Sequence, residues 1–373
     1  MKKLALLVPQ IALAVTLVGC QNTSGNTAVT CSALTTTKAS PSPNWGGTVF
    51  TIVMENKGLG QIRGNGGAPF INQLIKQNAL AGAYHDSYVH PSEPNYLWMV
   101  AGENFGVLND NDPGATNHIA TASHLADQLE AAGLSWKSYQ ESLGPGCGLS
   151  SNGDYAAKHN PFVYFDDING WDGTKVNVTQ RCTDHIVDYS QFDADLAAGK
   201  LPRYAFITPN LQNDMHDGSI AAGDQWLARE VPKILGSDAF NKGGVLFLLW
   251  DEGQAAGITT GDDPPFIVIS PNAKPGYESK IVYDTSSFLK TVQTILGIDT
   301  LPCNPQGASV QAMDDLFTVP LSGGGTATPA DAGTPATATT ATPTTATATP
   351  TTTTPTTATP TTTTATPTPT PTY

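Results

Sequence analysis

The segment GVLFLLW, residues 244–250, decides the fold, because every residue after its glycine is apolar. A strand with one face in water alternates apolar and polar residues, whereas a strand covered on both faces is a continuous apolar run. VFTIVM (49–54) and FIVIS (266–270) show the same pattern, and strand-like runs also occur at LSWKSYQ (134–140) and RYAFITP (203–209). These segments predict a buried central sheet.

Segments with helical spacing of apolar residues alternate with these strands. They are PFINQLIKQNAL (69–80), HLADQLEAAG (124–133), DQWLAREVPKILGS (224–237) and TSSFLKTVQTILG (285–297). Such alternation is typical of a mostly parallel sheet with helices on both faces. The sequence therefore predicts an α/β fold, a three-layer sandwich with a mostly parallel central sheet.

The two ends of the chain differ in composition from the segment between them. A basic start and an apolar run that closes on LVGC (17–20) match a lipoprotein-type signal peptide, so we expect lipidation of Cys20. The alternative is an ordinary signal peptide with an incidental cysteine. The C-terminal segment is almost all Thr, Pro and Ala and has too few apolar side chains to bury. The predicted organisation is a signal peptide at 1–19, an N-terminal linker at 20–45, a folded domain at 46–320 and a disordered tail at 321–373.

The chain is acidic, with a net charge of −14 that becomes −16 when Lys2 and Lys3 leave with the signal peptide. An acidic surface without a basic run repels nucleic acid, so nucleic acid is excluded as a partner. We expect an exported protein held at the cell membrane, on the cell surface, by the lipid on Cys20. The membrane is then one expected partner.

Four cysteines remain after Cys20, an even number that in an exported protein indicates two disulfides. Three pairings are possible. We favour Cys147–Cys182, because these two residues bracket one polar insertion, and Cys31–Cys303 would then join the ends of the domain.

Polar side chains follow three of the predicted strands. Glu55 and Asn56 follow 49–54, the segment NLQNDMHD (210–217) follows 203–209, and Asp251 and Glu252 follow 244–250. Sites in open α/β sheets lie beyond the carboxyl ends of the strands. Carboxylate and amide oxygens suit a hard or borderline divalent cation, so the sequence predicts a metal site at this edge.

Ser92 lies between Pro91 and Pro94, and an apolar run follows it. The residue is either an ordinary turn residue or a nucleophile presented by the turn. We expect the helix to begin near Asn95, so that its N-terminal amides would favour an anionic phosphoryl group. A Ser-His-Asp hydrolase would need glycines two positions to either side of the serine, and this chain has His90 and Pro94 there.

Five motifs in this order resemble the bacterial and fungal phosphoesterase family. That family contains acid phosphatases and phosphatidylcholine-type phospholipases C and belongs to the alkaline phosphatase-like superfamily. The resemblance covers about residues 46–300, essentially the whole folded part. The motifs are MEN (54–56), PSEPNY (91–96), KHNPF (158–162), PNLQNDMHD (209–217) and WDEG (250–253).

The resemblance implies a role for each matching residue. Ser92 would be the nucleophile and Asn95 would contact the phosphoryl oxygens, while Glu93 has no assigned role. Two histidines, His159 and His216, would stabilise the transition state or protonate the leaving group. One divalent metal ion of unknown identity would be held by Glu55, Asn56, Asp251 and Glu252. Some relatives carry aspartate where Glu252 stands.

The resemblance and the export signals together predict an exported acid phosphatase. It would hydrolyse small phosphomonoesters through a phosphoserine at Ser92. One alternative is a phosphodiesterase of the phospholipase C type, and another is a surface lipoprotein without catalysis. A diester site would need an apolar pocket, and the aromatic residues that could line one are otherwise ordinary core residues: Tyr96, Trp98, Tyr164, Phe165 and Trp171.

Overall fold

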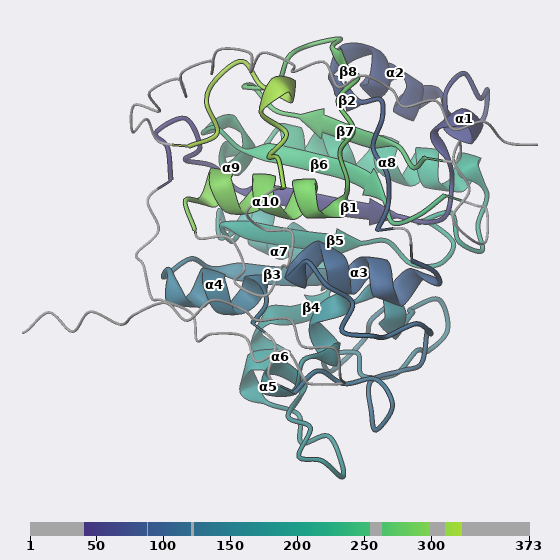
Figure 1. The fold of residues 1–373 in the computed structure, drawn as a ribbon, viewed down its shortest axis with the longest axis vertical. Helices are drawn as coiled ribbons and strands as arrows, with labels where there is room; N and C mark the ends of the chain where they lie inside the picture. Colours follow the sequence, from purple (N-terminus) through teal and green to yellow (C-terminus); the bar gives the residue numbers. More distant parts are fainter. Residues whose placement is uncertain (1–40, 88, 121–122, 254–262, 299–309, 323–373) are drawn as a thin grey trace, which may run out of the picture. The chain divides into compact units, whose positions relative to one another are not determined.

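The computed structural model describes residues 41–87, 89–120, 123–253, 263–298 and 310–322 (Figure 1). The predicted signal peptide, the lipidated Cys20, most of the linker, the Cys31–Cys303 disulfide and nearly all of the tail lie outside these residues. They stay predictions, as do the boundaries proposed for them.

Eight strands form one sheet in the order β4-β3-β5-β1-β6-β7-β2-β8. Neighbouring strands are parallel except at β7, which runs against both β6 and β2. The predicted, mostly parallel sheet is therefore confirmed, with one reversed strand. The strands are β1 (Val49–Met54), β2 (Ala79–Ala81), β3 (Trp136–Gln140), β4 (Ile186–Asp188), β5 (Tyr204–Thr208), β6 (Val245–Trp250), β7 (Phe266–Ile269) and β8 (Glu278–Ser279).

The central strands β1 and β6 are apolar throughout because both faces of the sheet are covered. In β6, Phe247 and Leu249 pack into one hydrophobic cluster, whereas Leu248 and Trp250 pack into another on the opposite face. Successive strand residues point to opposite faces, so a continuous apolar run supplies two cores at once.

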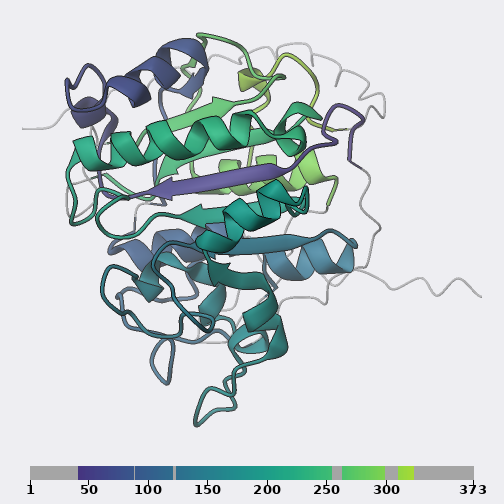
Figure 2. The ribbon, with the colours of Figure 1, turned by 180° about the vertical axis from the view of Figure 1, so that it is seen from behind.

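Helices cover both faces of the sheet, as the three-layer prediction requires. Figure 1 shows α3 (Ser92–Ala101), α4 (Leu125–Ala131) and α10 (Thr285–Leu296) in front of the strands. Figure 2 shows α2 (Pro69–Gln77), α7 (Ser190–Ala197) and α8 (Ile220–Leu235) on the reverse face. The remaining elements are short: α1 (Leu59–Ile62), α5 (Asp166–Asn169), α6 (Gln180–His185), α9 (Asp238–Asn241), and the 3-10 turns η1 (Ala157–His159), η2 (Pro161–Tyr164) and η3 (Asp314–Leu316).

Three predicted helix boundaries are wrong. Helix α8 begins at Ile220, four residues before the predicted start at 224. The segment 69–80 does not form one helix, since α2 ends at Gln77 and β2 follows at once. Helix α3 begins at Ser92 rather than near Asn95. Pro94 is compatible with this earlier start, because the first four N–H groups of a helix have no intrahelical partner and proline loses nothing there.

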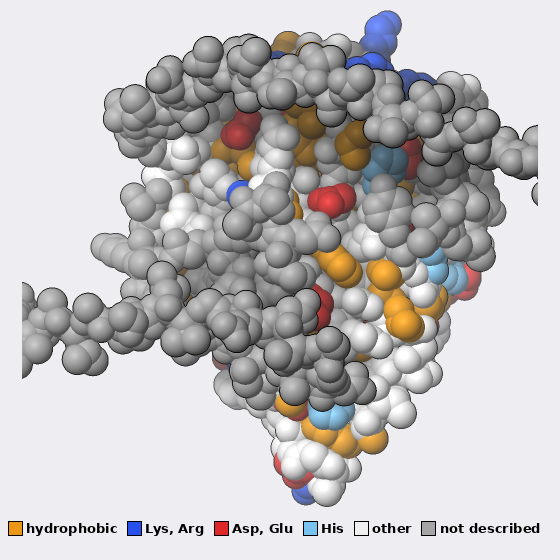
Figure 3. All heavy atoms as spheres, in the orientation of Figure 1, with side chains coloured by type: hydrophobic (Ala, Val, Ile, Leu, Met, Phe, Trp, Pro, Cys, Tyr) orange, Lys and Arg blue, Asp and Glu red, His pale blue; other side chains and the backbone are white. Residues whose placement is uncertain are grey.

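The predicted disulfide between Cys147 and Cys182 is present, with Cα atoms 5.6 Å apart. Within the described ranges, no helix has both the length and the apolar character needed to cross a bilayer. On the face drawn in Figure 3, the Lys and Arg side chains of the described residues form no broad basic surface. This agrees with the excess of acidic residues, 32 against 18 basic ones.

Candidate active site

The predicted site lies where three neighbouring strands end. Strands β5, β1 and β6 are adjacent and parallel, so the segments that follow them meet at one edge of the sheet. The backbone N–H of Glu55, after β1, donates to the carbonyl oxygen of Asp214, after β5 (2.8 Å). The N–H of Asp251, after β6, donates to Met54 O (3.0 Å). Side chains that are far apart in the sequence are thereby held together.

Ser92 is the first residue of α3 and is buried, with 1% of its surface exposed. Its Oγ donates a hydrogen bond to Glu55 Oε2 at 3.3 Å. A serine that only formed a turn would not need its hydroxyl directed at a buried carboxylate at the end of the central strand. The structure thus brings the predicted nucleophile to the predicted metal-binding edge.

Glu55 is the most connected residue of the site. Besides Ser92, its carboxylate accepts a short hydrogen bond from Tyr96 OH (Oε1, 2.5 Å) and lies 3.2 Å from His159 Nε2. Burial raises the pKa of Glu55 well above its ordinary value, and the nearby carboxylates of Asp251 and Asp214 raise it further. Protons, a cation or both are therefore needed to balance the charge of this group.

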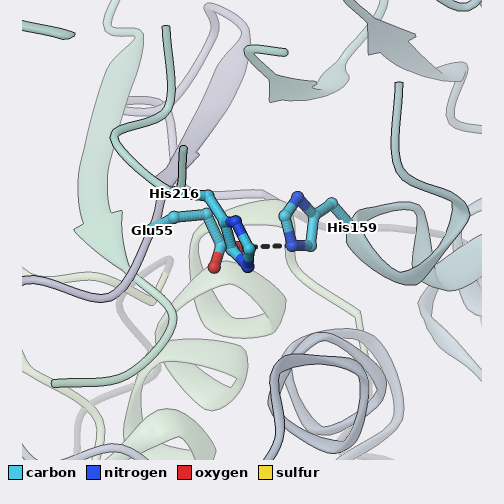
Figure 4. Close-up of side chains that lie close together, drawn as sticks. All are labelled: Glu55, His159 and His216. Atoms are coloured by element: carbon cyan, nitrogen blue, oxygen red, sulfur yellow. Dashed lines mark ion pairs between the residues drawn. The ribbon is translucent and has the colours of Figure 1, made fainter. Parts of the chain in front are cut away.

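His159 comes from η1, on the opposite side of the site from Glu55 and His216, and the three side chains converge (Figure 4). Its Nδ1 lies 3.3 Å from Asp214 Oδ2, and its ring stacks on Tyr96 at 5.1 Å between centroids. Burial lowers the pKa of His159 well below its ordinary value, and the positive charge of Lys158 lowers it further. Both effects favour the neutral form of the imidazole.

His216 is held at both ring nitrogens. Nδ1 lies 2.7 Å from Asp217 Oδ1, and Nε2 lies 3.2 Å from Lys158 Nζ. An ammonium group can only donate hydrogen bonds, so Nε2 must accept and the ring proton is on Nδ1. His216 was predicted as a proton donor to the leaving group, but Nε2 has no proton to give in this arrangement.

The N-terminal amides of α3 offer fewer free hydrogen-bond donors to an anion than we expect from the sequence. The N–H of Glu93 donates to Asp110 Oδ1 at 3.1 Å, and Pro94 has no N–H. Asp110 also accepts from Lys158 Nζ at 2.9 Å, through Oδ2. The backbone amide of Glu93 is therefore hydrogen-bonded to the protein itself and is not free to bind an anion.

Asn95 is fully buried and its amide is engaged. Nδ2 donates to Val89 O at 2.7 Å and to Glu252 Oε2 at 3.0 Å. Because an amide nitrogen has two hydrogens, both donors are used, and Asn95 positions Glu252 rather than reaching a phosphoryl oxygen here. Glu252 also lies 2.7 Å from His90 Nδ1, and burial together with Asp251 raises its pKa to about 10.

The site is crowded with carboxyl groups. Burial raises the pKa of Asp251 to about 7, and burial likewise raises that of Asp214 to about 7. Lys158 acts against burial, since its charge lowers the pKa of both and also that of Glu55 and Glu252. Burial would lower the pKa of Lys158 itself, but its hydrogen bond to Asp110 and the carboxylates raise it above its ordinary value.

These residues fit a divalent cation. Three buried atoms of the site make no hydrogen bond of good geometry to a described residue: Asp251 Oδ2, Asp214 Oδ2 and His159 Nε2. The last two have only the longer contacts within the site, at 3.3 Å to His159 Nδ1 and at 3.2 Å to Glu55 Oε1. Unpaired buried polar atoms are costly, and carboxylate oxygens with imidazole nitrogens are common ligands of divalent metals. The ligand atoms of Glu55, His159 and His216 lie within 4.8 Å of one another.

Of the four predicted ligands, only Glu55 belongs to this converging group. Asp251 Oδ1 accepts from the backbone N–H of Asn56 at 3.2 Å, and Glu252 is bound to Asn95 and His90. All four predicted ligands follow the ends of β1 and β6, but the structure adds two histidines to the candidate ligands.

Several residues that contact the site were not predicted to take part in its chemistry. Three of them, Tyr96, Lys158 and Asp214, belong to the five motifs, so they could have been predicted as site residues from their positions in the sequence. Asp110 stands outside all five motifs, in a polar loop, and no pattern marks it. Tyr96, Tyr164 and Phe165, considered for an apolar pocket, are fully buried in the hydrophobic core.

Comparisons with known proteins identify the family of this chain. The model of the phosphoesterase family matches residues 62–299. The chain is 32% identical over 252 residues to the phosphatidylinositol-3-phosphatase of Mycobacterium tuberculosis, covering 67% of this chain and 77% of that protein. It is also 32% identical over 250 residues to an acid phosphatase of Aspergillus fumigatus, covering 64% of this chain but only 52% of the fungal protein.

The fold has a counterpart among solved structures. A protein of the alkaline phosphatase superfamily from Vibrio parahaemolyticus superposes with a TM-score of 0.51 over 75% of this chain and 74% of that one. The two are only 12% identical, so the likeness shows the fold alone. The alkaline phosphatase-like α/β architecture is thereby confirmed.

Proposed function

The chain belongs to the phosphoesterase family and is a hydrolase of phosphoric ester bonds, and from this premise we propose that it is an acid phosphatase. It hydrolyses phosphomonoesters through a phosphoserine at Ser92. The observation that carries this proposal is the hydrogen bond from Ser92 Oγ to Glu55 Oε2, made by two buried side chains among His159, His216 and Asp251.

The reaction proceeds in two displacements. Ser92 Oγ attacks phosphorus and passes its proton to the ionised carboxylate of Glu55, while the bond from phosphorus to the leaving oxygen breaks and that oxygen takes a proton from solvent. Water then attacks the phosphoserine, the Oγ–phosphorus bond breaks, and Ser92 regains a proton as phosphate leaves. His159 faces the reacting group, and His216 holds Lys158, whose positive charge stabilises that group.

A divalent cation would supply Lewis-acid stabilisation of the phosphoryl charge. The residues that would hold it are Glu55 with Asn56, Asp251 and Glu252, as the family resemblance implies. His159 and His216 are further candidates from their positions, and His216 would bind the cation in place of its contact with Lys158.

The direct test is the activity of Ser92→Ala on p-nitrophenyl phosphate. This leaving group departs as a stable anion, so the assay does not depend on a proton donor. Ser190→Ala is the matched control, because Ser190 also begins a helix and donates its hydroxyl to a carboxylate, Asp188 (2.6 Å). We expect Ser92→Ala to lose activity by at least about 1,000-fold and Ser190→Ala to keep it. Near-normal activity of Ser92→Ala would end the nucleophile assignment.

Two alternatives are tested by the same enzyme preparation. A phosphodiesterase of the phospholipase C type would hydrolyse a phosphorylcholine ester faster than a phosphomonoester, whereas the acid phosphatase proposal expects the reverse at pH 5. A surface protein without catalysis would hydrolyse neither. Ser92, His159 and His216 lie around Glu55 in the described site, which favours catalysis.

We also propose that the protein is exported and anchored to the cell membrane by a lipid on Cys20. The support is the LVGC sequence at 17–20 after a basic start and an apolar run. Growth with labelled palmitate should label the wild-type chain and not Cys20→Ala, and the variant should leave the membrane fraction. Equal labelling of both would contradict the anchor.

A further inference from the structure

Lys158 places a positive charge among the carboxyl groups of the site. It belongs to η1, and its side chain is 17% exposed. Its Nζ is 2.9 Å from Asp110 Oδ2 and 3.2 Å from His216 Nε2. The first contact anchors the ammonium, and the second holds it beside a histidine whose ligand atom lies within 4.8 Å of Glu55.

Lys158 retains capacity to bind an anion. An ammonium group has three N–H donors. Among the described residues, Asp110 and His216 occupy two of them. The third remains for a phosphoryl oxygen of the substrate.

Several donors beside Ser92 are not available to an anion. The N–H of Glu93 is bound to Asp110, Pro94 has none, and both donors of the Asn95 amide are bound to protein oxygens. Lys158 therefore offers a full positive charge to an anion, whereas the first turn of α3 offers few free hydrogen-bond donors.

Above the second pKa of a monoester, phosphomonoesters and phosphodiesters differ by one charge. With a second pKa of about 6, a monoester is mainly a dianion at pH 7, whereas a diester carries a single negative charge. A divalent cation attracts both substrates. An additional fixed positive charge stabilises the monoester more, because it meets the extra charged oxygen.

We propose that Lys158 determines substrate class at this site, by binding the charged oxygen that a phosphomonoester has and a phosphodiester lacks. The inference rests on the proposed phosphatase function and deepens it. Asp110 is the positioning residue, since it holds Lys158 and is itself fixed to the first turn of α3.

The test compares two substrates with one leaving group, p-nitrophenyl phosphate and bis-p-nitrophenyl phosphate, at pH 7. For Lys158→Met we expect kcat/KM for the monoester to fall about 100-fold, the size found when one preorganised donor is removed. The diester should lose much less, because it lacks the charged oxygen that Lys158 binds. Inhibition by inorganic phosphate should weaken in parallel with the loss of monoester hydrolysis.

Two further variants separate charge from structure. Lys158→Arg keeps the charge, so its preference for the monoester should stay near the wild-type value even if both rates fall. Lys137→Met is the matched control, since Lys137 also pairs with an aspartate, Asp195 (2.6 Å), but on β3 and α7 away from the strand-end site. It should leave both rates unchanged.

The outcomes are distinct. Equal losses for both substrates in Lys158→Met would mean that Lys158 only supports His216 or the fold, and would overturn the inference. A preference lost in Lys158→Arg as well would overturn it too. A wild-type enzyme that hydrolyses no monoester would instead refute the proposed function, and this inference with it.

Discussion

Glu93 should make the free energy of unfolding depend on pH, and replacing Glu93 with glutamine should remove that dependence. Its side chain is fully buried beside the nucleophile, and the Asn117 amide donates to both carboxylate oxygens, at 3.0 and 2.9 Å. Burial raises the pKa of Glu93 from 4.5 to about 8, despite the opposing effect of Asn117. Glu93 is therefore protonated in the folded protein at neutral pH.

The magnitude and the sign follow from this pKa. The folded protein keeps a proton that the unfolded chain releases above about pH 4.5, so the free energy of unfolding falls as pH rises from about 4.5 to about 8. Each pKa unit corresponds to about 1.4 kcal/mol, so a rise from 4.5 to about 8 corresponds to a loss of up to about 5 kcal/mol across this window.

Glu93→Gln replaces the protonated acid with a neutral side chain of similar shape. The variant should have nearly wild-type stability at pH 5 and exceed the wild type by about 2–5 kcal/mol at pH 8. Urea denaturation followed by tryptophan fluorescence measures both values. Asp238→Asn is the control, because this side chain is 90% exposed and should change neither.

The reasoning would be refuted by a parallel pH dependence in the two proteins. If Glu93→Gln loses as much stability between pH 5 and pH 8 as the wild type, ionisation of Glu93 does not contribute. A variant less stable than the wild type at pH 8 would show that the carboxylate is stabilising in its ionised form.

Three further predictions concern contacts in the described residues. Tyr96→Phe removes the hydrogen bond to Glu55 and should cost about 1.5–3 kcal/mol of stability and about 10-fold in kcat/KM. Urea denaturation and a phosphatase assay measure the two losses. The control is Tyr204→Phe, at a buried tyrosine in β5, which should keep its activity. Chelation should reduce activity and bound metal together, and adding a divalent cation should restore both. If activity is lost while the metal content stays the same, the metal assignment is wrong. Replacing both Cys147 and Cys182 with serine opens a loop with a sequence separation of 35 and should cost about 2–4 kcal/mol, whereas a loss well below about 1 kcal/mol would contradict a structural role.

The fold was predictable where burial leaves a strong pattern in the sequence. The run at 244–250 is apolar because β6 is covered on both faces, and the structure places β6 within one residue of that segment. The reversed direction of β7 could not be read from 266–270, because a buried strand has the same composition in either direction. Strands β2, β4 and β8 have three residues or fewer, too short for any periodicity.

The site was predictable where its residues directly follow a strand or stand in a motif. Glu55, Asp251 and His216 were found in this way. Asp110 was not found, because its role depends on how the loop after α3 folds back to meet Lys158. The sequence also could not show that the side-chain amide of Asn95 and the backbone N–H of Glu93 are already hydrogen-bonded, because their partners are known only from the structure.

The central claim is that a phosphoryl group is transferred to Ser92. The most direct measurement is to mix the enzyme with a ³²P-labelled phosphomonoester, quench in acid within milliseconds, and identify the labelled peptide by mass spectrometry. We predict acid-stable phosphate on Ser92 that disappears as substrate is exhausted. Label on another residue, or turnover with no labelled peptide at any time, would contradict the claim.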